Sequence, residues 1–121
     1  MDIRFIETDE TEEFITEERC HILELLNDQT DRSFSIARAR VESDITTAWH
    51  RLKDTSESYY ILEGEGRMQI GEDFIKDVKK GDVVKIPKNT AQRIKNIGDD
   101  DLVFLCFCVP AFGAENYESM E

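Results

Sequence analysis

Short stretches of β-type residues, separated by turn residues, constrain the fold of this chain most strongly. The segment SFSIARARV, at 33–41, alternates with a period of two, so its side chains fall on two opposite faces. Further stretches lie at 58–64, 67–70, 74–78, 83–87, 91–98 and 102–109. Turn signals separate them, among them Gly71-Glu72-Asp73, Gly81-Asp82 and Gly98-Asp99. Many short strands at this spacing predict an all-β barrel or sandwich with few helices.

The size and charge of the chain narrow the class further. Its 121 residues are 40% hydrophobic and include seven Phe, enough for one domain with one core. The net charge of −12 argues against nucleic acid or an anionic membrane as a partner, because both require a cationic surface. We expect the acidic residues of Glu7–Glu18, Asp99–Asp101 and the C-terminal tail to be solvated.

Targeting and redox signals point to one compartment. No apolar run reaches the roughly 18 residues that span a bilayer, and the start, MDIRFIETDETEE, does not have the pattern of a signal peptide. The three Cys form no disulfide framework, and Cys106 and Cys108 lie in an apolar stretch. We therefore expect buried, reduced thiols and a cytoplasmic protein without a membrane partner.

Two segments carry a family resemblance. They are HRLKDTSESYYILEGEG at 50–66 and GDVVKIPKNTAQRIKN at 81–96, and they resemble the two conserved motifs of the cupin superfamily. The sequence of these segments is also similar to that of small stand-alone cupins labelled mannose-6-phosphate-isomerase-like. The residues at matching motif positions are His50, Glu57, Gly64, Gly81, Asp82, Pro87 and Asn96.

The resemblance implies a double-stranded β-helix, also called a jelly-roll barrel, over residues 31–112. It leaves residues 1–30 as an acidic N-terminal extension, with an early strand packed on the barrel, and 113–121 as a C-terminal tail. It also implies a homodimer, because many small cupins pair through an outer sheet.

Two departures from the motifs bear on chemistry. Leu52 stands where the second motif histidine is expected, and Gln92 stands where the last one is expected. His50, Glu57 and Gln92 remain as candidate ligands for a divalent transition metal, namely Zn, Fe, Mn, Ni or Cu. Three protein ligands would leave coordination positions open for water or a small-molecule ligand.

Two other hypotheses use the same residues without a metal. His50 and Glu57 could move protons in an isomerase or epimerase, with Tyr59 as a partner acid. Alternatively, the three polar side chains could form a satisfied hydrogen-bond network in a binding module that has no turnover. The sequence leaves all three open, and with them whether the protein is an enzyme.

A pair of arginines raises a further question about the ligand. Arg38 and Arg40 share one face of the 33–41 stretch. If that face lined the barrel, they could hold a carboxylate or a phosphate through paired hydrogen bonds. The alternative is that at least one of them is a surface charge.

Overall fold

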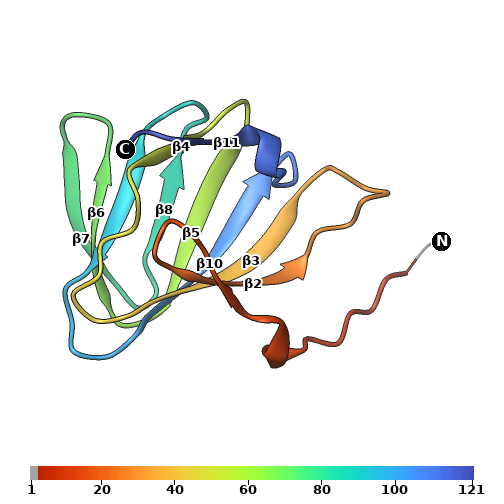
Figure 1. Cartoon of the computed structure of the whole chain (residues 1–121), viewed down its shortest axis with the longest axis horizontal. Helices are drawn as coiled ribbons and strands as arrows, with labels where there is room; N and C mark the ends of the chain where they lie inside the picture. Colours follow the sequence, from red (N-terminus) through yellow and green to blue (C-terminus); the bar gives the residue numbers. More distant parts are fainter. Residues whose placement is uncertain (1–2) are drawn as a thin grey trace.

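In the computed structural model, residues 3–121 form two antiparallel sheets that curve around a shared interior (Figure 1). This confirms the predicted all-β class and barrel architecture. One sheet has the strand order β1 (Phe14–Ile15), β2 (His21–Leu26), β3 (Ser35–Val41), β10 (Leu102–Val109), β5 (Ser56–Glu63) and β8 (Val83–Ile86). The other has the order β11 (Tyr117–Ser119), β4 (His50–Leu52), β9 (Gln92–Asn96), β6 (Glu65–Ile70) and β7 (Phe74–Lys79). Two short 3-10 helices, η1 (Glu10–Glu12) and η2 (Ala114–Asn116), lie near the chain ends.

The interior is built from alternate residues of the strands, as the period of two predicts. His50 and Leu52 of β4 are both buried, so they share the inner side of the strand. Strands β5 and β9 contribute the buried side chains Glu57, Tyr59, Ile61, Gln92, Ile94 and Asn96. Polar and apolar side chains therefore share the same interior.

Strand β10 organises the six-stranded sheet because it pairs with β3 on one side and with β5 on the other. Its inward residues alternate along the whole strand, and the prediction that Cys106 and Cys108 are buried thiols is confirmed. Burial raises the pKa of the Cys106 thiol well above its ordinary value, so this side chain acts as a small apolar group. The inward residues of β10 are Leu102, Phe104, Cys106 and Cys108.

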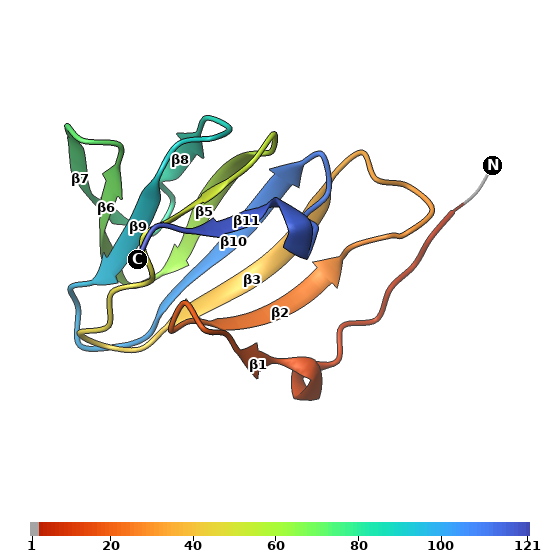
Figure 2. The same cartoon turned by 45° about the horizontal axis from the view of Figure 1, so that its top comes forward.

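Both ends of the chain join the sheets. Strand β2 pairs with β3, and β1 continues that edge (Figure 2). At the other end, β11 pairs with β4 and places Ser119 opposite His50. The sheets therefore extend on both sides of the predicted 31–112 barrel. The segment expected to be a tail, 113–121, contains η2 and β11.

The two arginines of β3 lie on the face opposite Ala37 and Ala39, and they are paired with acids. Arg38 donates to Glu10, and Arg40 donates to Glu13. Arg40 also reaches Asp101 at 3.2 Å. These acids are therefore not simply solvated, and neither arginine is placed to hold an anion inside the barrel.

No helix within residues 3–121 is long and apolar enough to cross a membrane. The predicted homodimer, the cytoplasmic location and the exclusion of nucleic acid stay predictions.

Gly64 provides a test of the packing between strands. Its φ is +87°, and a Cβ atom there would lie 2.7 Å from the Asp101 backbone oxygen. Gly71 also has a positive φ, +59°, but a Cβ atom there would meet nothing within 4 Å. We expect Gly71→Ala to lower the free energy of unfolding by roughly 1 kcal/mol, from the backbone alone. Gly64→Ala adds a clash with fixed backbone and should cost roughly 3 kcal/mol. Urea unfolding of both variants, followed by Trp49 fluorescence, measures the difference, and equal losses would contradict it.

Candidate functional site

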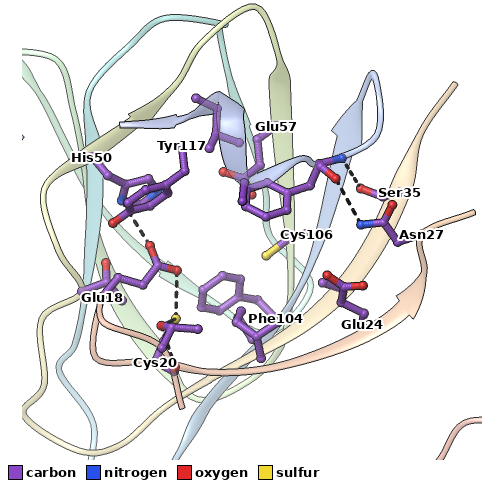
Figure 3. Close-up of a pocket in the computed structure, with 18 of the residues that line it drawn as sticks. Glu18, Cys20, Glu24, Asn27, Ser35, His50, Glu57, Phe104, Cys106 and Tyr117 are labelled. Atoms are coloured by element: carbon purple, nitrogen blue, oxygen red, sulfur yellow. Dashed lines mark hydrogen bonds and ion pairs between the residues drawn. The ribbon is translucent and has the colours of Figure 1, made fainter. Parts of the chain in front are cut away.

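A pocket of about 440 Å³ opens between the two sheets (Figure 3). Its walls come from β3, β5 and β10 on one side and from β4 and β11 on the other. Residues of β1, β2 and the turn between them close the remaining side. This volume lies in the range that is usual for small-molecule sites.

The structure brings the four residues predicted from the sequence together. His50, Glu57 and Tyr59 line the pocket, and Gln92 lies buried behind them. The Tyr59 hydroxyl donates to Gln92 Oε1 at 2.6 Å, and Gln92 Nε2 donates to Glu57 Oε1 at 2.7 Å. The side chains of Tyr59, Gln92 and Glu57 therefore form one hydrogen-bonded chain. Both the oxygen and the nitrogen of the Gln92 carboxamide have a partner.

The His50 ring is held in one orientation. Its Nδ1 donates to the backbone oxygen of Ala48 at 2.7 Å. The ring also stacks on Tyr117, with centroids 5.1 Å apart and planes 22° apart. Because Nδ1 carries the proton, Nε2 of the neutral ring has a free lone pair. Within residues 3–121, no hydrogen bond to Nε2 is formed, although the His50 side chain is only 6% exposed.

Glu57 is the buried acid of the site. Burial raises the pKa of its carboxyl group above the ordinary value of 4.5, and the Gln92 hydrogen bond and the attraction of His50 offset only part of this rise. Its second oxygen, Oε2, lies 3.6 Å from the Cys108 sulfur. We therefore expect Glu57 to keep its proton at a pH where an exposed glutamate has lost it.

Glu18 is a site residue that the sequence did not reveal. It precedes β2, and its Oε2 lies 3.5 Å from His50 Nδ1, while its Oε1 accepts a hydrogen bond from Cys20 Sγ at 3.0 Å. The expectation of a solvated Glu7–Glu18 segment is wrong at Glu18, whose Oε2 is buried. The one available signal was its position two residues before the apolar Cys20, which is too weak to identify a site. Tyr117 was missed in the same way, as part of a presumed tail.

A metal ion does not fit these residues as they are arranged. Two of the positions where the resemblance implies imidazole ligands are occupied by Leu52 and Gln92. Leu52 cannot bind a metal, and the carboxamide of Gln92 is already bound to Tyr59 and Glu57. Within residues 3–121, no three His, Cys, Asp or Glu side chains are grouped as a metal site. The metal site on His50, Glu57 and Gln92 remains a prediction that this geometry does not favour.

Comparison with known proteins agrees with the architecture. The model of the Cupin domain family matches residues 39–108. An uncharacterized protein of Methanocaldococcus jannaschii is 36% identical over 123 residues, covering 100% of this chain and 98% of that protein.

Two solved structures are similar in fold. A Klebsiella pneumoniae protein with a double-stranded β-helix domain has a TM-score of 0.78 and 13% identity, covering 99% of each chain. A nucleoside dehydratase, Pac13, has a TM-score of 0.79 and 16% identity; a variant of this Streptomyces protein has also been solved with uridine. The match to Pac13 covers 98% of this chain and 92% of the other.

The raised pKa of Glu57 predicts a pH effect on stability. Above about pH 4.5 the unfolded chain loses this proton while the folded chain keeps it, so wild type loses stability as the pH rises. Glu57→Gln cannot ionise. Its free energy of unfolding relative to wild type should therefore increase with pH, by about 1.4 kcal/mol for each unit of raised pKa, and then level off. Urea unfolding over a pH series measures this, and a constant or falling difference would contradict it.

Restoring the missing imidazoles tests the fit of a metal. We expect Leu52→His with Gln92→His to bind Zn²⁺ or Ni²⁺ on the order of 100-fold more tightly than wild type, because two ligands are added. Isothermal titration of untagged protein measures the affinities, and circular dichroism confirms that the variant is folded. Adding His50→Ala to the variant should remove the gain. If the wild-type chain binds one metal ion and His50→Ala loses it, the wild-type residues do hold a metal, and our expectation that a metal does not fit is wrong.

Proposed function

This chain belongs to the cupin family, and we propose that its pocket binds a small polar molecule and moves protons on it without a metal ion. The observation that carries the proposal is the presence of His50 and Glu57, both buried side chains, on the wall of one pocket. One side chain offers a lone pair, and the other has a carboxyl pKa raised by burial. Side chains with perturbed pKa values in a cleft are typical of catalytic sites.

His50 is the proposed base. The backbone oxygen of Ala48 fixes the proton on Nδ1, so Nε2 accepts a proton from the bound molecule. The ring then becomes a cation, and the Glu18 carboxylate, 3.5 Å from Nδ1, stabilises that charge. Stacking on Tyr117 keeps the ring in place during the transfer.

Glu57 is the proposed acid. Gln92 donates to Oε1, so the carboxyl proton lies on Oε2. Tyr59 acts through Gln92, because its hydroxyl donates a hydrogen bond to the carboxamide oxygen. Burial raises the pKa of Tyr59 well above the ordinary value of 10.0, so the hydroxyl keeps its proton. In this account Tyr59 positions Gln92, and Glu57 rather than Tyr59 supplies the proton.

The fold likeness to a nucleoside dehydratase is compatible with this chemistry. Expelling water from an organic molecule requires one proton to be removed and another to be supplied. At 16% identity the likeness concerns the fold, so the reaction and substrate of that enzyme are not transferred to this chain.

A binding module without turnover is the second candidate. The observation that favours it is the chain from Tyr59 through Gln92 to Glu57, since a satisfied buried network needs no catalytic role. The two candidates differ in one property, because only the enzyme exchanges protons with the bound molecule.

Deuterium exchange separates them without knowledge of the product. We test wild type in D₂O against a panel of small hydroxylated and amino compounds. We expect it to introduce deuterium into at least one of them, or to eliminate water from it. Proton NMR of the compounds measures both reactions. His50→Ala and Glu57→Gln should each lower the rate on the order of 100-fold or more. His21, which pairs with Glu42 outside the pocket, gives the matched control, and His21→Ala should keep the wild-type rate.

Two results would refute the proposed enzyme. One is binding of a panel compound by wild type with no exchange or elimination, which would favour the binding module. The other is equal rates for wild type and His50→Ala.

A further inference from the structure

The charge of the pocket wall is one-sided. Four glutamates line it, and within the described residues no Lys or Arg does. His50 is therefore the one basic side chain on the wall. The lining glutamates are Glu17, Glu18, Glu24 and Glu57. Glu57 is the proton-bearing acid of the proposed site, so the negative charge of the wall comes from the other three.

The arginines near the pocket have partners of their own. Arg32 donates to the Asn27 side chain and to the backbone oxygens of Asp28 and Phe112, and four others pair with carboxylates. Arg38 and Arg40 contact Glu10 and Glu13 on the opposite face of β3. At the chain ends, Arg19 pairs with Glu121 and Arg51 with Glu118. A carboxylate or phosphate in the pocket would approach Glu18 with no Lys or Arg among the described lining residues to offset the repulsion.

Two hydrogen-bond acceptors of the pocket are without a donor in the part of the chain that the structure describes. Glu18 Oε2 is fully buried and has no hydrogen-bond partner within residues 3–121. His50 Nε2 is also without one in this part of the chain, on a side chain that is 6% exposed. An unsatisfied buried acceptor costs roughly 1–3 kcal/mol, so Glu18 Oε2 favours a ligand that brings a donor. The free lone pair of His50 Nε2 can accept a second hydrogen bond from the same ligand. Figure 3 shows the Glu18 and His50 side chains next to one another at the edge of the pocket.

We propose that the pocket takes a small organic amine in its protonated form, with the ammonium group on Glu18 and the apolar body against the aromatic wall. An ammonium group has three donors and no acceptor, which matches the two unpartnered acceptors. Aromatic rings on the wall also attract a cation that lies over their faces. These rings include Phe14, Phe104, Phe112 and Tyr117. The inference uses the pocket of the proposed function, but it concerns binding and does not require turnover.

Three matched probes test the charge preference. Benzylamine, benzyl alcohol and benzoate share one ring and differ in charge, and shifts in ¹H–¹⁵N NMR spectra of the full chain report their binding. We expect benzylamine to bind with a Kd in the millimolar range or tighter and at least about 5-fold more tightly than benzyl alcohol. Benzoate should not bind.

A variant of the proposed contact gives the second part of the test. Glu18→Gln should weaken benzylamine about 5-fold to 50-fold and leave benzyl alcohol unchanged, because the amide keeps the shape and loses the charge. Glu12→Gln removes the same charge from the exposed helix η1 and should change neither affinity. The Glu18→Gln loss should persist at high salt, since a buried contact is screened weakly.

Several outcomes would overturn the inference: no binding of benzylamine at millimolar concentration, tighter binding of benzyl alcohol or benzoate, or equal effects of Glu18→Gln and Glu12→Gln. These failures are distinct from failure of the proposed function. Proton exchange that occurs only with uncharged compounds would support the proposed function and contradict the inferred preference for an amine. Amine binding through Glu18 without any proton exchange would support the amine preference and contradict the proposed proton transfer.

Discussion

The carboxamide of Gln92 joins the two sheets, and the geometry of the pocket depends on it. Gln92 belongs to β9 of the five-stranded sheet, whereas Tyr59 and Glu57 belong to β5 of the six-stranded sheet. An amide has both a donor and an acceptor, so it can bridge a hydroxyl and a carboxyl group with neither left unsatisfied. A motif position that the resemblance assigns to a metal ligand is therefore used here to connect the sheets and to orient the buried acid.

The chain ends complete what the family motifs begin. The segment that matches the family, 39–108, supplies His50, Glu57 and the Gln92 bridge. Glu18 and Tyr117 lie outside that segment, and both contact the His50 ring. Strand pairing brings them there, through β2 on β3 and β11 on β4. The barrel thus provides the proposed proton-transfer pair, and the ends set the charge and shape of the space beside it.

Much of the fold could be predicted from the sequence, because its signals are local. A period of two decides which side chains of a strand share a side, and the family resemblance pointed to His50, Glu57 and Gln92, all of which are buried in the structure. Glu18 and Tyr117 could not be predicted, because their segments have no periodicity and their burial depends on pairing with distant strands. The role of Gln92 was also hidden, since a carboxamide suits a metal, a carboxyl group or a hydroxyl equally well until its neighbours are placed.

Diffraction at the zinc absorption edge, from crystals grown with Zn²⁺, tests the central claim that this pocket is an organic acid–base site. The account predicts no anomalous peak beside His50 Nε2. It also predicts that the contacts from Tyr59 to Gln92 and from Gln92 to Glu57 remain at 2.6 and 2.7 Å. A peak roughly 2.0–2.3 Å from both His50 and Glu57, with Gln92 turned away from Tyr59, would contradict it.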